Sequence, residues 1–230
     1  MPVSNQWPEV IYYRLLIPEI LPSDIELVLY CDCDILIRGD ISGIFNENLE
    51  DYSVAAVEDI LSPIAPMSIN LGCNPEYGYF NSGVLLINLN YWRERNITRK
   101  CLKFINENLH IIKHPDQDAL NAILNKSWKR LQYRWNFLDS YQAQYYCKEH
   151  MMSDFDKAND FYPIIVHFSG VKPWNEKCRS IYKIEYHEYF LDHRVSITKP
   201  EHSFFQKVKH AIIVFFDKIG IRKNKVNYYF

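Results

Sequence analysis

Residues 25–34 read IELVLYCDCD, and this stretch decides the fold. Its first six residues form a short apolar run after a Pro-Ser-Asp turn, which predicts a buried strand of a parallel sheet. Asp32 and Asp34 follow at the carboxyl end of that strand. Residues i and i+2 of an extended segment point the same way, so the two carboxylates can face one ion. Oxygen ligands of this kind suit Mg²⁺ or Mn²⁺.

The Asp-x-Asp spacing alone is weak support for a metal site. The same spacing occurs at residues 116 and 118 and at residues 154 and 156, and a solvated turn is the alternative for any such pair. The placement of Asp32 and Asp34 favours a metal, because two carboxylates directly after a buried strand are costly without a counter-ion.

Strands and helices alternate along the rest of the chain. Three more apolar runs predict strands at 53–57, 81–89 and 164–168. Residues 92–109 have helical spacing, and another helix should begin at Pro115 with Asp116 as its cap. Such alternation predicts an α/β layer fold, in which ligands lie beyond the carboxyl ends of the strands.

Two basic side chains stand near the end of the last apolar run. His167 could be a hydrogen-bonded core residue, or it could join the two carboxylates in a mixed oxygen and nitrogen site, which fits Mn²⁺ better than Ca²⁺. Lys172 is either a surface lysine or a point charge for a phosphate.

Three further polar residues have simple structural alternatives. Asp116 and Gln117 would serve as cap and first-turn residues of a helix, and Asn81 would shape a turn before a strand. Each of the three also lies where a strand end or a helix start could contribute to a ligand site.

Composition narrows the classes of function. The 230 residues suffice for one sizeable core with a small appendage. A net charge of −2 argues against a nucleic-acid surface. The chain has only 7 glycines and neither glycine-rich phosphate motif, so a metal or basic side chains would have to hold any phosphate. Six cysteines without a C-x-x-C pair fit reduced thiols of a cytoplasmic protein, and no signal-peptide core or membrane span is visible.

The composition changes at about residue 199. Residues 199–230 hold seven basic residues against two acidic ones, and apolar residues recur at helical spacing from Phe204 to Ile219. We therefore expect a main domain at 1–198 and a basic amphipathic tail at 199–230. The tail would contact an anionic membrane, on the inner face of the cell membrane, or else pack its apolar stripe on the main domain.

Five blocks in fixed order resemble glycosyltransferase family 8, which includes glycogenin and bacterial lipopolysaccharide galactosyl- and glucosyltransferases. The blocks are Tyr13-Arg14-Leu15, LVLYCDCDILIRGDI from residue 27, FNSGVLLINLNYWR from residue 80, HPDQDALNAIL from residue 114 and HFSGVKPW from residue 167. The resemblance implies a single Rossmann-like α/β domain of the GT-A type that binds a UDP-sugar and Mn²⁺, with Mg²⁺ as an alternative.

The resemblance also implies roles for individual residues. The metal ligands would be Asp32, Asp34 and His167. Gly170 and Lys172 would contact the phosphates of the donor. The donor sugar would be surrounded by Arg14, Asn81, Asp116 and Gln117, of which Asp116 and Gln117 are the candidate catalytic residues. The loop between residues 59 and 79 would shape the acceptor side.

The implied reaction is a retaining transfer of a hexose, glucose or galactose, from a UDP-sugar to a glycan or lipid-linked saccharide. The metal and Lys172 would neutralise the charge that builds on the departing UDP. No carboxylate nucleophile of the kind that retaining glycosidases use is evident, since Gln117 is a poor nucleophile and Asp118 a less favoured candidate. Attack on the face that UDP leaves is the favoured hypothesis.

One departure from the family pattern concerns the start of the chain. The family's first strands hold the uridine, and nothing before Tyr12 resembles them. We therefore expect a sheet with an open edge near residues 25–30 and weak binding of UDP-sugar. Two alternatives remain, an inactive relic of a glycosyltransferase and a haloacid-dehalogenase-like phosphatase with Asp32 as nucleophile and Asp34 as acid.

Overall fold

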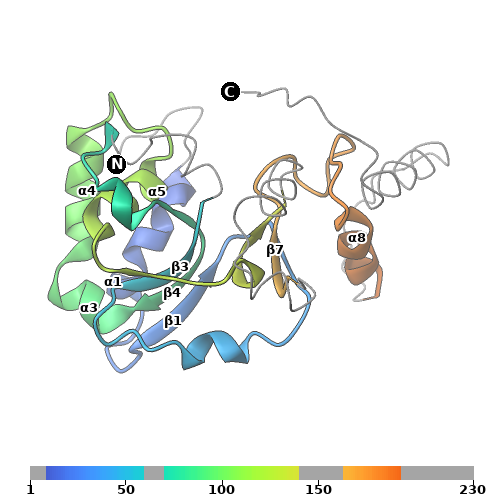
Figure 1. Cartoon of the computed structure of the whole chain (residues 1–230), viewed down its shortest axis with the longest axis horizontal. Helices are drawn as coiled ribbons and strands as arrows, with labels where there is room; N and C mark the ends of the chain where they lie inside the picture. The colour runs from blue at the N-terminus through green and yellow to red at the C-terminus, as the bar shows by residue number, and fades with distance from the viewer. Residues whose placement is uncertain (1–8, 60–69, 140–162, 193–230) are drawn as a thin grey trace.

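The computed structural model describes residues 9–59, 70–139 and 163–192 (Figure 1). In chain order, with η for 3-10 helices, the elements are η1 (Glu9–Leu16), α1 (Ile17–Ile20), β1 (Leu27–Cys31), β2 (Ile35–Ile37), η2 (Ser42–Asn46), β3 (Val54–Glu58), η3 (Pro75–Tyr77), β4 (Phe80–Asn88), α3 (Leu89–Glu94), α4 (Ile97–Glu107), α5 (Pro115–Leu124), β5 (Trp128–Arg130), η4 (Tyr133–Trp135), β6 (Phe137–Leu138), β7 (Ile165–His167) and α8 (Lys183–Asp192). The predicted α/β class is confirmed.

The larger sheet has four strands in the order β1-β4-β3-β5. β4 runs antiparallel to both of its neighbours, while β3 and β5 are parallel. The prediction that β1 is a buried strand of a parallel sheet is therefore wrong, because its partner β4 is antiparallel and its residues are half-buried. Among the described strands β1 pairs only with β4.

β4 is the centre of the molecule because its side chains alternate between two cores. Leu85 and Ile87 pack with residues of α3, α4 and α5 on one face of the sheet. Val84 and Leu86 pack on the other face, against residues that include Ile165 of the second sheet. Figure 1 shows the helices α1, α3, α4 and α5 on one side of the larger sheet and β7 with α8 on the other.

The smaller sheet holds three strands in the order β2-β7-β6, with β2 antiparallel and β6 parallel to β7. The segment after β1 joins the two sheets. The Asp32 N–H donates to the Gly83 carbonyl of β4 at 2.8 Å, and two residues later the Asp34 carbonyl accepts from the Phe168 N–H at 2.9 Å. The Asp-x-Asp segment therefore crosses from one sheet to the other.

The helices differ from prediction in two places. The single helix expected at 92–109 is two helices, α3 and α4, because Asn96 takes a left-handed conformation with φ 51°. The helix that begins at Pro115 is confirmed, but Asp116 does not cap it. The Asp118 carboxylate instead accepts from the backbone N–H groups of Lys113 and His114, at 2.7 and 3.0 Å.

Several predictions fall on residues that the structure does not describe. The amphipathic tail at 199–230 lies outside the described residues, and so do residues 60–69 of the loop between residues 59 and 79. Within the described ranges, no helix has both the length and the apolar character that crossing a membrane requires. The five cysteines in those ranges are free thiols.

Candidate metal and donor site

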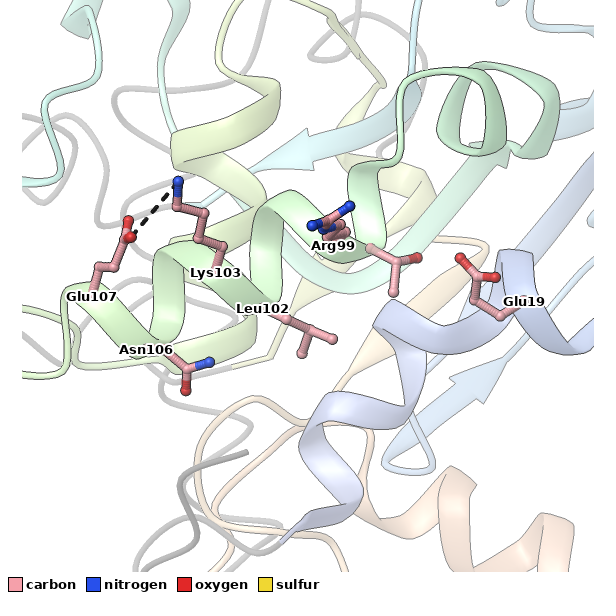
Figure 2. A pocket seen from close by; sticks show the side chains of 7 residues that line it. Glu19, Arg99, Leu102, Lys103, Asn106 and Glu107 are labelled. Atoms are coloured by element: carbon pink, nitrogen blue, oxygen red, sulfur yellow. Dashed lines mark ion pairs between the residues drawn. The ribbon is translucent and has the colours of Figure 1, made fainter.

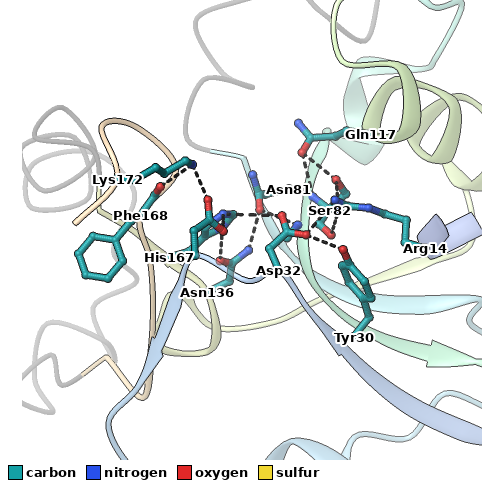
Figure 3. Close-up of polar contacts among 12 residues, drawn as sticks. Arg14, Tyr30, Asp32, Asn81, Ser82, Gln117, Asn136, His167, Phe168 and Lys172 are labelled. Carbon is teal, nitrogen blue, oxygen red and sulfur yellow. Dashed lines mark hydrogen bonds and ion pairs between the residues drawn. The ribbon is translucent and has the colours of Figure 1, made fainter. Parts of the chain in front are cut away.

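Three side chains from both sheets converge beyond the end of β1. Asp32 follows β1, Asp34 precedes β2 and His167 is the last residue of β7. One ligand atom from each lies within 4.8 Å of the other two. Figure 3 shows the side chains of Asp32 and His167 next to each other. His167 Nε2 lies 3.4 Å from Asp34 Oδ1 and 3.9 Å from Asp32 Oδ2. The predicted convergence of these three residues is confirmed.

Of the two carboxylate oxygens of Asp34, one accepts a hydrogen bond and the other does not. The Lys172 ammonium donates to Asp34 Oδ2 and to the Phe168 carbonyl, the latter at 2.8 Å. Asp34 Oδ1 is buried and has no hydrogen-bond partner. Burial raises the pKa of Asp34, but His167 and Lys172 more than offset it, so the pKa lies below its ordinary value and the carboxylate is ionised. A buried ionised oxygen without a donor suits a cation.

The ring of His167 lies directly on the backbone of β4. A Cβ at residue 83 would lie 2.6 Å from His167 Nδ1 and 3.0 Å from Asp32 Oδ2. Only glycine leaves room for both side chains there. On its other side, His167 Nδ1 lies 3.1 Å from Oδ1 of the buried Asn136. The imidazole is therefore held between β4 and the residue that precedes β6.

Arg14 connects three elements around Asp32. Its guanidinium donates to Asp32 Oδ1 at 2.8 Å and to the Ser82 carbonyl at 2.7 Å, and it pairs with Asp116 Oδ2 at 3.0 Å. It also lies 4.7 Å from the centre of the Tyr30 ring, whose hydroxyl donates to Asp32 Oδ1. Burial raises the pKa of Asp116 although Arg14 lowers it. Asp116 is thus a buried partner of Arg14.

The side-chain amides of Gln117 and Asn81 both donate a hydrogen bond to the Asp59 carboxylate. Gln117 Oε1 accepts from the Ser82 N–H at 2.9 Å, and Gln117 Nε2 donates to Asp59 Oδ2 at 3.3 Å. Asn81 Nδ2 donates to the same Asp59 oxygen at 3.2 Å. Of the two amides that the family resemblance assigns to the donor sugar, Gln117 is thus held by Ser82 and Asp59, and Asn81 by Asp59.

The contacts around Asp32, Asp34 and His167 bring together eight of the nine residues predicted for the site. The ninth, Gly170, is exposed in the loop between β7 and Lys172. The sequence missed Tyr30, Asp59, Ser82, Gly83 and Asn136. Tyr30 carried a signal, because it lies two residues before Asp32 and so faces the same way.

The side chain of Asp118, the less favoured nucleophile candidate, makes contacts that hold α5 in place. It is 2% exposed, and it accepts hydrogen bonds from the Lys113 and His114 N–H groups before α5 and from the Tyr79 hydroxyl. Both of its oxygens thus have partners, Oδ2 at the start of the helix and Oδ1 at Tyr79.

A surface hollow lies elsewhere, where α1 approaches α4 (Figure 2). Its lining includes Glu19, Arg99 and Leu102, and its Lys103–Glu107 ion pair is exposed. None of its lining residues belongs to the network around Asp32. The hollow has the composition of an ordinary solvated helix surface.

Comparisons with known sequences agree on one family. The model described as glycosyl transferase family 8 matches residues 1–178. The chain is 35% identical over 193 residues to general stress protein A of Bacillus subtilis, an alignment that covers 81% of this chain and 66% of that protein. It is 29% identical to a lipopolysaccharide 1,2-glucosyltransferase of Escherichia coli, over 92% of this chain and 65% of that protein. It is also 29% identical to the lipopolysaccharide 1,3-galactosyltransferase of Salmonella typhimurium, over 76% and 52%.

Solved structures share the fold. The galactosyltransferase LgtC, crystallised with donor and acceptor sugar analogs, matches with a TM-score of 0.72 at 24% identity, over 87% of this chain and 72% of LgtC. The glycosyltransferase GlyE of Streptococcus pneumoniae matches with a TM-score of 0.63 at 22% identity, over 99% of this chain and 50% of GlyE. The fold is of the GT-A type. The chain spans about half to two thirds of the curated relatives named above.

Proposed function

The chain belongs to glycosyl transferase family 8, and from this premise we propose that it is the catalytic part of a retaining, metal-dependent hexosyltransferase. It would move glucose or galactose from a UDP-sugar to a glycan or glycolipid acceptor. The observation that carries the proposal is the convergence of Asp32, Asp34 and His167 next to Lys172. Two of the relatives are named for glucosyl or galactosyl transfer to lipopolysaccharide, which supports the choice of sugars and of a saccharide acceptor.

The three side chains fit a divalent cation. They offer two carboxylates and one imidazole nitrogen, and the partnerless Asp34 Oδ1 faces the imidazole. Mixed oxygen and nitrogen ligands favour Mn²⁺, with Mg²⁺ as the alternative. When bound, the cation would neutralise negative charge on the diphosphate of the donor. Family membership also favours this reading of the Asp-x-Asp segment over the phosphatase alternative.

Lys172 is the side chain that would stabilise the departing UDP. Its ammonium is half-buried, lies against Asp34 and is fixed by the Phe168 carbonyl. A cation already fixed in this position needs little rearrangement when charge develops on a phosphate. Gly170 would let the same loop approach the phosphates closely.

The residues around the sugar support attack on the face that UDP leaves. Asp116 is buried and paired with Arg14, so it is poorly placed to act as a nucleophile. Gln117, the other candidate catalytic residue, is an amide held by Ser82 and Asp59. We assign Arg14, Asn81, Asp116 and Gln117 to the position of the donor sugar, without a covalent intermediate on the protein.

A screen of UDP-sugars by Mn²⁺-dependent hydrolysis tests this function. We expect the unsubstituted chain to hydrolyse UDP-glucose or UDP-galactose slowly, and Asp34→Ala to lose that activity with the fold intact. Normal turnover by Asp34→Ala would contradict the metal assignment. Failure of every UDP-sugar would favour the inactive relic, and hydrolysis of a simple phosphate monoester would favour the phosphatase.

We propose that the tail at 199–230 binds the cytoplasmic face of the membrane, where lipid-linked acceptors would be presented. The assignment rests on its basic charge and its apolar stripe alone. Each basic residue near an anionic surface contributes about 1 kcal/mol at low salt. Deletion of residues 203–230 should abolish sedimentation of the protein with anionic vesicles. Unchanged sedimentation would indicate that the stripe packs on the main domain instead.

A further inference from the structure

A buried amide faces the metal-site histidine from behind. Asn136 has no solvent exposure and directly precedes β6, which pairs with β7. Its Oδ1 lies 3.1 Å from His167 Nδ1, and its Nδ2 donates to Asn81 Oδ1 at 2.9 Å. The hydrogen bonds therefore continue from His167 through Asn136 to Asn81 (Figure 3).

The contacts of Asn81, the last residue of this series, determine which group donates and which accepts in each of its hydrogen bonds. The Gly83 N–H donates to Asn81 Oδ1 at 3.0 Å, and a backbone N–H can only donate. Asn81 Nδ2 donates to Asp59 Oδ2 at 3.2 Å. The oxygen and nitrogen of Asn81 are thereby distinguished by their partners.

The same reasoning orients Asn136 in turn. Because Asn81 presents an oxygen, Asn136 must turn its NH₂ group toward it, which leaves Asn136 Oδ1 for the imidazole. An amide oxygen can only accept, so His167 Nδ1 must carry a proton.

We infer that Asn136 is a positioning residue that keeps the proton of His167 on Nδ1 and so directs Nε2 toward Asp32 and Asp34 as the metal-binding nitrogen. The consequence for metal binding rests on the proposed function, whereas the position of the proton follows from the hydrogen bonds alone. Metal-ligating histidines generally hold their second nitrogen in this way, and loss of the partner typically weakens metal binding by about 10- to 100-fold.

The position of the proton is measured on the full-length chain without metal or donor. Long-range ¹H–¹⁵N correlation of ¹⁵N-histidine-labelled protein at pH 9 distinguishes the two neutral tautomers, and His167→Gln identifies the signal of residue 167. We expect the Nδ1–H form in the unsubstituted chain. Asn136→Asp keeps an acceptor and should keep this form, whereas Asn136→Leu removes the acceptor and should shift His167 toward the Nε2–H form.

Asn121→Leu is the matched control. Asn121 is also buried, at 1% exposure, but its side chain bonds to the backbone of Phe80 and Gln117 and to none of Asp32, Asp34, Asn136 and His167. This substitution should lower stability without changing the tautomer of His167. Mn²⁺ affinity, measured by electron paramagnetic resonance, should fall about 10- to 100-fold in Asn136→Leu and little in Asn136→Asp or Asn121→Leu.

A neutral imidazole in the unsubstituted chain with its proton on Nε2 and none on Nδ1 would overturn the inference, and this measurement decides even where Asn136→Leu does not fold. Unchanged tautomer and Mn²⁺ affinity in a folded Asn136→Leu protein would also overturn it. A chain with the Nδ1–H tautomer that neither binds Mn²⁺ nor hydrolyses UDP-sugars would instead contradict the proposed function and leave the role of Asn136 in the tautomer supported.

Discussion

Gly83 shows how a single residue without a side chain shapes the site. A Cβ there would press on the His167 ring and on Asp32 Oδ2. We predict that Gly83→Ala displaces both ligands and weakens Mn²⁺ binding by at least about 10-fold, in a titration followed by electron paramagnetic resonance. Gly39→Ala is the control, because its Cβ would meet only Ile164, at an ordinary 3.8 Å. Equal Mn²⁺ affinity in the two variants would show that the close approach at Gly83 is unimportant.

Single residues differ in how far the sequence could reveal them. Asp32, Asp34 and His167 follow or end apolar runs, so their place at strand ends was predictable. Asn136 was not, because it reaches His167 only through the pairing of β6 with β7, whose strands are far apart in the sequence. Which side chain donates and which accepts across such a pair of strands can be read only from the folded structure.

At the scale of elements, Arg14 holds η1 against the end of β1 and the start of α5 through Asp32 and Asp116. Arg14→Met would leave two carboxylates without their partner, and loss of one member of a buried ion pair costs about 3 kcal/mol. We predict a loss of that size in the free energy of unfolding, measured with urea at pH 7. Lys103→Met, which breaks an exposed pair, should cost about 0.5 kcal/mol or less.

The loss of stability caused by Arg14→Met should depend on pH. Asp116 has a raised pKa in the folded chain, so its contribution to stability is fully present below its ordinary pKa and is lost as pH rises through the folded value. Arg14 lowers that pKa, and its removal should raise it further. We therefore expect Arg14→Met to destabilise the protein less at pH 4 than at pH 7. A loss that is the same at both values would contradict this account of Asp116.

The break between α3 and α4 is a local feature that apolar spacing did not reveal. Asn96 is exposed and has φ 51°, a conformation that costs most residues about 1 to 2 kcal/mol but that Asn and Gly adopt more readily. We predict that Asn96→Ala lowers the free energy of unfolding by about 1 kcal/mol, while Asn96→Gly changes it little. Equal losses in the two variants would place the cause in the Asn96 side chain instead of the backbone.

Strand direction was the other feature of the elements that the sequence could not supply. The apolar run at 25–30 located β1 but contained nothing that distinguishes a parallel from an antiparallel partner. The direction of β1 depends on β4, which enters the sheet after the loop that begins at Asp59. Runs of apolar residues thus predicted where strands lie, whereas their neighbours and directions depend on contacts between distant parts of the chain.

At the scale of the whole molecule, the metal site lies where the two sheets meet. Asp32 follows a strand of the larger sheet, and His167 belongs to the smaller one. A cation held by both should therefore stabilise the folded chain as a unit, by about 2.7 kcal/mol when its concentration is 100 times Kd. For a chain of this size that corresponds to a rise in Tm of about 5 to 10 °C. We predict this rise on addition of Mn²⁺ to the unsubstituted protein, measured by circular dichroism, and its absence in Asp34→Ala. An equal rise in Asp34→Ala would mean that Mn²⁺ binds elsewhere, because the variant lacks the central carboxylate of the site.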